Sequence, residues 1–368
     1  MILTDVNTLL DLSVAVINFN GATSLIPALK SVYALEGVRL ATVMVVDNAS
    51  TDDSVAVVKQ HFPEVQVCCL PENRGPNPAR NTGLRRAATD LVLIMDNDIV
   101  LAADYIMRLA EVFRKRPATG AASGQIRIHD EPGTVQYNGI DIHYAGEIAA
   151  RPLEARDTVR VSCVSAGAAL FNRSHTLGAG GFDEDFFIGW EDGDLTFRLS
   201  LAGYPCYMVS GAVAYHMRRQ RGMKWVRYQT RNRWWFMMKN YDLRTFLLAL
   251  PAIVFFQFCA GLFLLLKGQG RAFLQGTVEA WADLPAIWRK RRTVQRLKKV
   301  PDTALLRGDR FDLPGGLSSS QAGRVINAVL NKLFFGYWLC IRLLLRRRPR
   351  ETCGKLAALS RSRRDKPI

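Results

Sequence analysis

Short apolar runs alternate with amphipathic stretches over the first hundred residues of the chain. Four runs rich in valine, leucine and isoleucine have the length of buried strands, and they are Leu12–Phe19, Ala41–Val46, Val65–Leu70 and Leu91–Met95. Helical patterns follow the first three runs, near residues 25–32, 55–61 and 79–88. Buried strands that alternate with helices predict an α/β fold with a mostly parallel central sheet and helices on both of its faces.

Polar residues stand where these apolar runs end. Asn18 and Asn20 close the first run, Asp47 closes the second, and Asp96 and Asp98 follow the fourth. In open α/β sheets ligands bind beyond the carboxyl ends of the strands, so the pattern predicts one cleft lined with amides and carboxylates. The chain lacks both G-x-G-x-x-G and G-x-x-x-x-G-K-[ST], so the dinucleotide-binding and P-loop classes lose their main support.

The segment Asp96-Asn97-Asp98 places two carboxylates two positions apart on a predicted turn. Hard divalent cations such as Mg²⁺ or Mn²⁺ prefer oxygen ligands of this kind, and a bound cation can neutralise a diphosphate leaving group. The same three residues are also compatible with an Asx turn that only caps the strand.

A second acidic segment, Trp190-Glu191-Asp192-Gly193-Asp194, lies at the predicted start of a helix near Asp192. Carboxylates crowded beside the aromatic pair Phe186-Phe187 raise one another's pKa, which suits a general base. The alternative is an acidic helix N-terminus that only interacts with the helix dipole. His216 follows an apolar strand, and its candidacy for a functional role depends on the other motifs.

Taken together and in order, these motifs resemble the inverting GT-A glycosyltransferases of family 2, a large group of bacterial polysaccharide and rhamnosyl-type transferases. The resemblance covers roughly residues 11–240. It rests on Phe19-Asn20, VVDNASTD, ENRGPNPARNTG, DND, GGFDEDFFIGWEDGDLTFRLSLAGY and the terminal His216. It implies a GT-A fold (Rossmann-like), a divalent cation and a nucleotide-sugar donor of the UDP or dTDP type.

The resemblance also implies roles for individual residues. Asp192 would be the catalytic base, which takes a proton from an acceptor hydroxyl as that oxygen attacks the anomeric carbon and inverts its configuration. Trp190 and Glu191 would lie in the acceptor site, and Asp98 and His216 would contact the metal. The implied donor-binding residues are Phe19, Asn20, Asp47, Asn73, Gly75, Arg80, Asn81, Asp96 and Asn97. For Asp47 an ordinary turn residue remains the alternative, and for Arg80 an exposed helix charge.

Three regions are expected along the chain. Residues 1–240 would form the catalytic domain, with a nucleotide-binding half over about 11–118 and an acceptor half over about 119–240. Within the acceptor half, the mixed composition of residues 120–165 predicts a loop-rich insertion. Residues 241–368 would form a basic, hydrophobic, membrane-associating region.

Composition supports this division. The chain has 368 residues and a formal net charge of +16, yet residues 1–266 carry 26 Lys or Arg and 26 Asp or Glu, whereas residues 267–368 carry 23 and 7. A neutral body is therefore followed by a basic region. The seven cysteines are scattered without a CxxC spacing, which favours buried thiols in a reducing compartment. The first residues lack the marks of a signal peptide, so a cytoplasmic body is expected.

The segment Phe246–Leu266 has 21 residues without a charge, enough to span about 31 Å as a helix and cross a bilayer. Val325–Leu345 is apolar but contains Asn, Lys and Arg, as interfacial helices do. Crossing the membrane would export basic clusters, against the positive-inside tendency. A monotopic or peripheral attachment to anionic lipid on the cytoplasmic face of a bacterial inner membrane is therefore favoured over spanning.

A lipid-seeking region would suit an enzyme whose acceptor is a lipid-linked or growing glycan. Nucleic acid is the rival partner for a basic region, but the interleaved Leu, Trp and Phe favour lipid, and no nucleic-acid partner is expected. Two other functions remain open. One is a nucleotidyltransferase on a related sheet, although the segment INFNGATSLIP lacks its phosphate loop. The other is a catalytically silent scaffold that recruits partners to the membrane.

Overall fold

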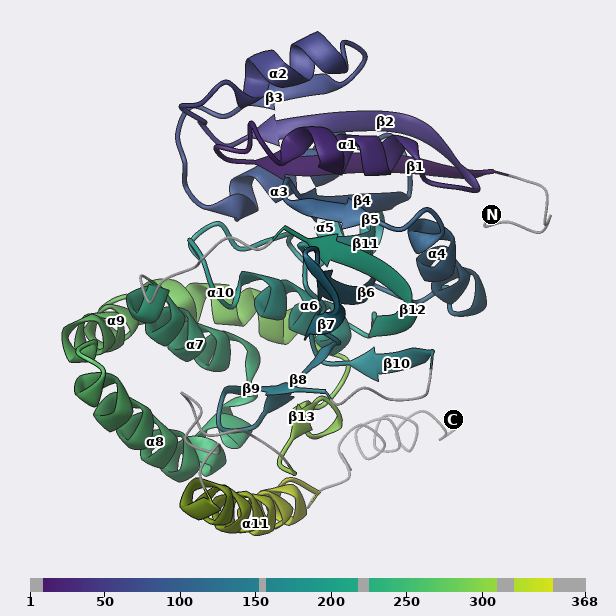
Figure 1. Ribbon diagram of the computed structural model, residues 1–368. Coiled ribbons are helices and arrows are strands. Elements are labelled where there is room, and N and C mark those ends of the chain that lie inside the picture. Colours follow the sequence, from purple (N-terminus) through teal and green to yellow (C-terminus); the bar gives the residue numbers. More distant parts are fainter. Residues whose placement is uncertain (1–8, 152–156, 218–224, 310–320, 347–368) are drawn as a thin grey trace, which may run out of the picture.

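The computed structural model describes residues 9–151, 157–217, 225–309 and 321–346. A ten-stranded sheet crosses the molecule, and helices cover both of its faces (Figure 1). Four parallel strands form one half of the sheet, in the order β3 (Gln66–Cys69), β2 (Val38–Asp47), β1 (Leu10–Asn18) and β4 (Leu91–Asp96). The four strands expected from the apolar runs are therefore present, and all are parallel.

Helices connect these parallel strands, as the periodicity predicts. They are α1 (Leu25–Tyr33), α2 (Ser54–His61) and α3 (Pro76–Arg86), and α4 (Tyr105–Lys115) follows the fourth strand. Buried side chains of α1, α2 and α4 pack on one face of the sheet, whereas α3 packs on the other face together with α6 (Glu191–Leu201). The two apolar layers explain why the residues of the central strands β1 and β4 are almost all buried, whereas β3 at the edge of the sheet is half-buried or exposed.

The other half of the sheet mixes directions. In it lie β11 (Ala168–Asn172), antiparallel to β4, then β6 (Ala121–Ile128), β12 (Cys206–His216) and β10 (Thr158–Val161). The short strand β5 (Ile99–Leu101) pairs with β12, and β7 (Glu131–Tyr137) pairs with β6. The helix α5 (Arg173–Gly178) follows β11 directly. This half brings the end of β12 next to the turn that follows β4.

The expectation of a loop-rich insertion over residues 120–165 is wrong. The region contains β6, β7 and β10, and two further strands, β8 (Ile140–His143) and β9 (Glu147–Ala150), which pair with each other. Three of the five strands have only four residues, and β7 is exposed along most of its length. Strands so short or so exposed give too weak an apolar pattern to be recognised: the alternation of β8 and β10 extends over only four residues.

In the part of the chain that the structure describes after β12, the helices are α7 (Val226–Asn240), α8 (Leu243–Leu266), α9 (Gly270–Ala282), α10 (Leu284–Leu297) and α11 (Gln321–Arg346). A third apolar core, rich in aromatic side chains, joins these helices to α6 and to β8. The 3₁₀ turn η2 (Asp302–Ala304) precedes β13 (Leu306–Arg307), which pairs with β8. The region after residue 240 is thus built into the acceptor half, and the expected boundary at that residue remains a prediction.

Candidate active site

A cleft of about 590 Å³ opens at the carboxyl ends of β1 and β4. It brings together most of the residues singled out from the sequence, although they come from six different segments. Those that line it are Phe19, Asn73, Gly75, Arg80, Asp96, Asn97, Asp98, Glu191, Asp192 and His216. The cleft therefore lies where the strand ends predict it, with amide and carboxylate groups in its wall.

Arg80 stands at the centre of the acidic side chains. Its side chain is buried, and Nη1 donates to Asp192 Oδ1 at 2.7 Å while Nη2 donates to Asp96 Oδ1 at 3.4 Å. The carboxylate of Glu191 lies 3.8 Å from Nη1. Burial alone would lower the pKa of Arg80, but the charges of Asp192, Asp96 and Glu191 together raise it. The alternative of an exposed helix charge is wrong: this arginine joins the acid after β4 to the acids of α6.

The local backbone explains how Arg80 reaches this place. Gly75 precedes α3 with φ +86°, a conformation that glycine adopts without the steric cost of a side chain. A Cβ at that position would lie 2.1 Å from the backbone oxygen of Phe187. The close approach of the two loops starts α3 at Pro76 and directs its buried face, with Arg80, into the cleft.

Glu191 and Asp192 open α6, directly after the left-handed residue Trp190 (φ 68°). Asp192 Oδ2 accepts a hydrogen bond from the backbone N–H of Ala166 at 3.0 Å, so both of its oxygens are oriented. Burial, and then the neighbouring Asp192, raise the pKa of Glu191 to about 7. Glu191 therefore carries a proton for much of the time at neutral pH, which leaves Asp192 as the better placed proton acceptor.

Asp194 does not belong to this group, although the sequence places it only two positions from Asp192. It is fully buried on the other side of α6, where Arg198 donates to it at 2.9 Å and Lys239 at 2.8 Å. The three acids that are close together in the sequence therefore have different surroundings. Glu191 and Asp192 line the cleft, whereas Asp194 forms buried ion pairs, because successive positions on a helix point in different directions.

Asp98 and His216 form a separate pair in the cleft. His216 Nε2 lies 3.3 Å from Asp98 Oδ2, and His216 Nδ1 lies 2.7 Å from Gln136 Oε1, which orients the ring. One carboxylate oxygen and one imidazole nitrogen facing the same space are ligands that suit a divalent cation. Within the described residues no three His, Cys, Asp or Glu side chains group closely enough to hold a metal by themselves. The pair fits a cation whose remaining ligands come from a bound substrate.

Four of the residues expected in the site do not line the cleft. Asp47 is buried behind it and accepts hydrogen bonds from Asn18 (2.7 Å) and Ser50. Asn20 accepts from the backbone of Thr51, and Asn81 ties α3 to the loop before α6. Trp190 packs against Phe236 with 4.9 Å between ring centres. These residues hold the walls of the cleft, and a direct role for them in binding stays a prediction.

Sequence reasoning missed other cleft residues. Asn48, Gln136, Tyr137, Ser165, Phe187 and Trp225 also line the cleft. Asn48 immediately follows Asp47, so its position beside a strand end was a usable signal. Gln136 and Tyr137 lie on β7, which the sequence pattern did not reveal, so no signal pointed to them.

Comparison with known proteins finds a family profile that matches the first part of the chain. The sequence profile of glycosyl transferase family 2 matches residues 13–176. An N-acetylglucosaminyltransferase of Rhizobium sp. (strain N33) is 30% identical over 203 residues, which is 52% of this chain and 45% of that protein. A poly-beta-1,6-N-acetyl-D-glucosamine synthase of Staphylococcus aureus is 27% identical over 191 residues, 50% of this chain and 45% of that protein. The chain thus spans a little under half the length of these curated relatives.

Among solved structures, GalNAc-T7 with UDP, GalNAc and Mn²⁺ superimposes with a TM-score of 0.55 at 16% sequence identity, over 65% of this chain and 49% of that one. This likeness concerns the fold alone. The matched family profile covers Arg80, Asp96 and Asp98, and the fold brings the acids of α6 to the same cleft. Residues 13–176 are a glycosyl transferase family 2 domain, and the chain has the GT-A fold.

Proposed function

We propose that this protein is a metal-dependent, inverting glycosyltransferase. It transfers a sugar from a nucleotide-sugar donor of the UDP or dTDP type to a hydroxyl of a lipid-linked or growing glycan, in the synthesis of a cell-surface polysaccharide. The observation that carries the proposal is the meeting of Asp96, Asp98 and Asp192 in one cleft, with Arg80 in contact with the first and the last. The names of the bacterial relatives support transfer of an amino sugar into a polymer.

The residues on the two sides of the cleft have different roles. On the donor side, Phe19, Asn73, Gly75, Asp96 and Asn97 contact the nucleotide. Asp47, Asn20 and Asn81 act there by holding the loops that carry those contacts. On the acceptor side, Asp192 accepts the proton of the attacking hydroxyl, and Glu191 beside it orients the acceptor. Attack from the face opposite the nucleotide inverts the configuration of the sugar.

Asp98 and His216 are the residues that would hold the divalent cation. When bound, the cation offsets the negative charge of the departing diphosphate. The His216 ring is already oriented by Gln136, so the pair offers a fixed carboxylate oxygen and a fixed nitrogen. Arg80 supplies the remaining positive charge of the cleft from its buried position.

Hydrolysis of nucleotide sugars in the presence of Mn²⁺ tests this function. We expect a member of a nucleotide-sugar panel to stabilise the protein in a thermal-shift assay and to be hydrolysed slowly. EDTA should abolish hydrolysis and Mn²⁺ should restore it. Asp98→Ala should lower the rate by at least about 10²-fold, since several kcal/mol of charge stabilisation are lost.

Asp130→Ala is the matched control, because that carboxylate is exposed at the tip between β6 and β7. Its rate should equal that of the unaltered protein. Formation of a nucleotide sugar and inorganic diphosphate from a nucleoside triphosphate and a sugar 1-phosphate, supplied in a separate reaction, would identify a nucleotidyltransferase. Absence of turnover with every nucleotide sugar would leave the silent scaffold as the function.

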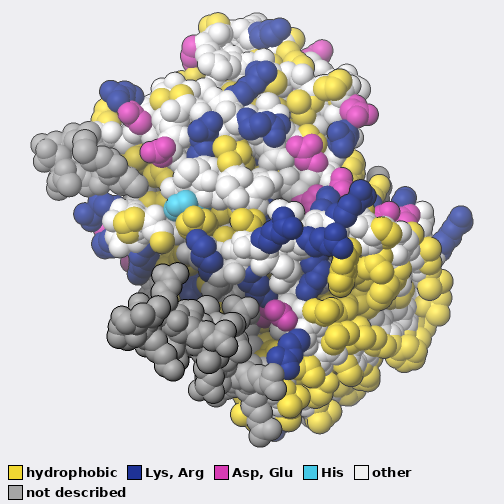
Figure 2. All heavy atoms as spheres, turned by 180° about the vertical axis from the view of Figure 1, so that it is seen from behind, with side chains coloured by type: hydrophobic (Ala, Val, Ile, Leu, Met, Phe, Trp, Pro, Cys, Tyr) yellow, Lys and Arg dark blue, Asp and Glu magenta, His cyan; other side chains and the backbone are white. Residues whose placement is uncertain are grey.

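Attachment to the membrane is part of the proposal. Among the described residues α8 and the stretch Gly323–Leu345 of α11 are long and apolar enough to cross a bilayer. Their outward sides form one apolar surface, which we name the membrane face. In Figure 2 hydrophobic side chains gather over these helices, with Lys and Arg along the edge. Its central residues are Leu247, Val254, Phe258 and Leu262 of α8 and Ile326, Val329 and Leu333 of α11.

The packing of α8 favours a helix that lies along the membrane surface. Its inward side is buried against the body, and Gln257, a buried polar residue near its middle, points toward Arg233 of α7. Arg233 Nη1 in turn donates to Glu147 of β9 at 2.8 Å. The buried residues of α8 recur on one side of the helix from Thr245 to Ala260, so there only the other side can meet lipid, which is the arrangement of a monotopic helix.

The basic helix α10 supports the same orientation. Lys290 pairs with Asp185 and Arg291 donates to the backbone oxygen of Met238, so α10 is held on the same body as the cleft. A crossing that separates α10 from the cleft would break these contacts. We therefore place the whole protein on the cytoplasmic face of a bacterial inner membrane, where its basic groups meet anionic lipid.

Charge placed on the membrane face is expected to release the protein from lipid. Phe258 is 70% exposed and Leu262 is 51% exposed, one turn apart on α8. Because burying each side chain in lipid contributes about 1.5–3 kcal/mol, the double substitution Phe258→Asp/Leu262→Asp should weaken binding to anionic vesicles by at least about 10²-fold. Co-sedimentation with vesicles measures this, and thermal melting checks the fold.

Met107→Asp provides the control. Met107 is an exposed apolar residue of α4, on the opposite side of the molecule from α8 (Figure 1). It should leave vesicle binding unchanged. Equal binding by the double variant and the control would contradict the assignment of the membrane face.

A further inference from the structure

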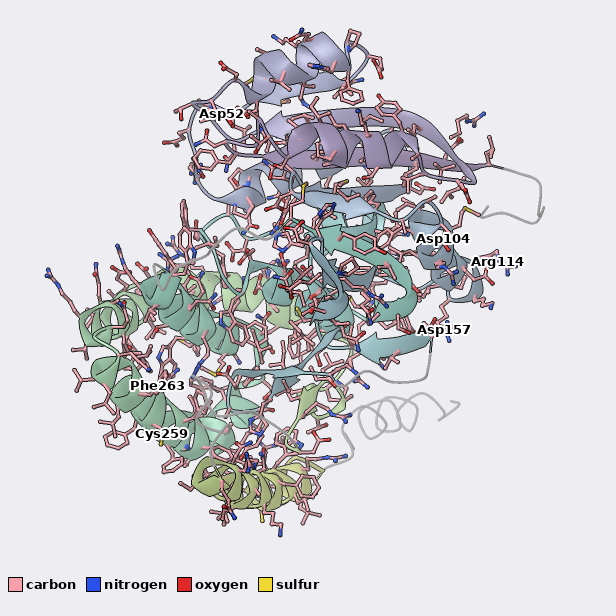
Figure 3. The ribbon with its side chains drawn as sticks, in the orientation of Figure 1. Asp52, Asp104, Arg114, Asp157, Cys259 and Phe263 are labelled. Atoms are coloured by element: carbon pink, nitrogen blue, oxygen red, sulfur yellow. The ribbon has the colours of Figure 1, made fainter. Side chains whose placement is uncertain are left out.

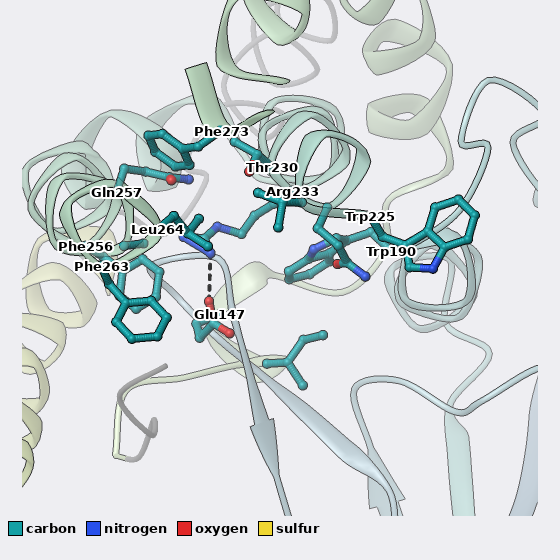
Figure 4. Close-up of a pocket in the computed structure, with 14 residues that line it drawn as sticks. Glu147, Trp190, Trp225, Thr230, Arg233, Phe256, Gln257, Phe263, Leu264 and Phe273 are labelled. Atoms are coloured by element: carbon teal, nitrogen blue, oxygen red, sulfur yellow. Dashed lines mark hydrogen bonds and ion pairs between the residues drawn. The ribbon is translucent and has the colours of Figure 1, made fainter. Parts of the chain in front are cut away.

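A second cavity lies between the membrane face and the catalytic cleft. It has a volume of about 330 Å³ and is enclosed by α7, α8, α9 and β9 (Figure 4). Trp225 lines both this cavity and the cleft, and Trp190, which also lines the cavity, directly precedes the cleft acids Glu191 and Asp192. The cavity therefore ends beside the acceptor side of the cleft.

The far wall of the cavity is apolar and belongs to the membrane-associated helices. Phe256, Ala260, Phe263 and Leu264 of α8 and Phe273 of α9 form it. Phe263 and Cys259 lie one turn apart on α8 (Figure 3). Leu262 and Leu265, which flank this wall in the sequence, are exposed on the other side of α8. One helix thus separates lipid from the cavity, with apolar side chains on both of its sides.

The wall nearer α7 and β9 is polar. Arg233 projects into the cavity, paired with Glu147 at 2.8 Å, and Gln257 accepts from its Nε at 3.1 Å when the amide is oriented to suit its neighbours. Burial lowers the pKa of Arg233, while the charge of Glu147 opposes that shift. Gln229 and Thr230 add further polar groups on the α7 side. The cavity is therefore amphipathic, with an apolar wall on α8 and hydrogen-bonding groups on α7.

We propose that this cavity binds the first part of the aliphatic chain of a lipid-linked acceptor, next to its anionic head group. The inference rests on the proposed function, and it assigns the acceptor an entry route from the membrane face. An aliphatic chain matches the aromatic and leucine wall, whereas a free glycan would leave its hydroxyls unpaired there. The head group would lie at the Trp225 end of the cavity, beside the polar groups of Gln229 and Thr230, with the attached sugar toward Asp192.

Photo-crosslinking tests the site directly. The probe is dodecyl phosphate with a diazirine on one of the first carbons of its chain, close to the phosphate, in vesicles of phosphatidylcholine and phosphatidylglycerol. We expect label on residues 225–233 of α7, which line the cavity and take no part in the membrane face. Leu264→Trp, which fills the cavity, should reduce this label by about tenfold or more. Label confined to the outward sides of α8 and α11 would overturn the proposal.

Leu262→Trp is the matched control for labelling, since it adds the same indole to the outward side of the same helix. It should keep the label on α7. Equal loss of label in the two variants would show that the indole acts on the helix or on the membrane contact, and would overturn the assignment of the cavity. Thermal melting of both variants checks that the fold is kept.

Transfer measurements separate this inference from the proposed function. The nucleotide sugar that the protein hydrolyses is supplied with a labelled sugar and with membranes of the producing cells. The ratio of organic-extractable product to hydrolysis should fall about tenfold or more in Leu264→Trp. If the unaltered protein neither hydrolyses nor transfers the sugar, the proposed function is wrong. The photo-crosslinking result then decides by itself whether the cavity binds an alkyl phosphate.

If the unaltered protein transfers the sugar and Leu264→Trp transfers it equally well, the proposed function is supported but the assignment of the cavity to the acceptor is wrong. A diazirine-bearing phospholipid completes the design. Suppose that this phospholipid labels α7 as strongly as the alkyl phosphate does, and that transfer by Leu264→Trp is unchanged. The cavity would then hold a bilayer lipid and not the acceptor.

Discussion

Asp192→Asn is expected to lower sugar transfer by about 10²–10⁴-fold, the usual contribution of a general base. The amide keeps the size of the carboxyl group and can still accept from the N–H of Ala166, but it cannot take the proton of the acceptor hydroxyl. Because Asp192 lies on the acceptor side, affinity for the nucleotide should change little. Initial rates of transfer and calorimetric binding of the nucleoside diphosphate measure the two effects.

Asp185→Asn is the matched control, since the Asp185 side chain is 53% exposed and its carboxylate pairs with Lys290, away from the acids of the cleft. It should transfer at nearly the unaltered rate. Normal transfer by Asp192→Asn would remove that residue from the role of base. Glu191, with its pKa raised to about 7, would then be the candidate to test by the same substitution to the amide.

Arg80→Met is expected to affect both stability and transfer. It would leave Asp96, Glu191 and Asp192 close together without their shared cation. Removing one partner from a buried ion pair costs about 3–5 kcal/mol, so the free energy of unfolding should fall by that order. Transfer should fall by about 10²-fold or more, because Asp192 loses the group that orients its Oδ1. Denaturant unfolding and transfer rates measure these changes.

The decrease in the free energy of unfolding caused by Arg80→Met is expected to depend on pH. Arg80 lowers the pKa of Glu191, so its removal raises this pKa above about 7 in the folded protein. A carboxyl group whose pKa is raised on folding binds more protons in the folded state, and its contribution to stability is lost as pH rises toward the folded pKa. The difference in free energy of unfolding between the unaltered protein and Arg80→Met should therefore grow as pH increases above about 7.

Arg80→Lys separates charge from geometry. Lysine retains the positive charge but has one nitrogen, whereas Arg80 reaches Asp192 and Asp96 through Nη1 and Nη2. We expect it to recover much of the stability and little of the transfer rate. Full recovery of both by lysine would show that only the charge matters and that Arg80 does not position Asp192.

The parallel half of the sheet was predictable because its signals are local. Runs such as Leu91–Met95 are buried on both faces, so every position is apolar, and the polar residues begin where the strand leaves the core. The acids at the end of β4 could therefore be assigned to a cleft from their sequence alone. β7 was not predictable, because its residues face solvent and obtain their partners only by pairing with β6.

Arg80 and Asp194 illustrate the same limit among the charged residues. Each lies on a helix with mixed polarity, and nothing in its neighbours in the sequence shows which way the side chain points. Arg80 lies 112 positions from Asp192 and yet contacts it, whereas Asp194, two positions from Asp192, is buried with Lys239 on another side of α6.

The four parallel strands, the position of the cleft, the acids that line it and the apolar length of α8 all follow from the linear pattern, since burial and turn chemistry act on neighbouring residues. The partner of each charge, the antiparallel half of the sheet and the cavity beside Trp225 follow only from the folded chain. They depend on contacts between segments that are distant from one another in the sequence, and the free energy of such contacts exists only once the core has brought those segments together.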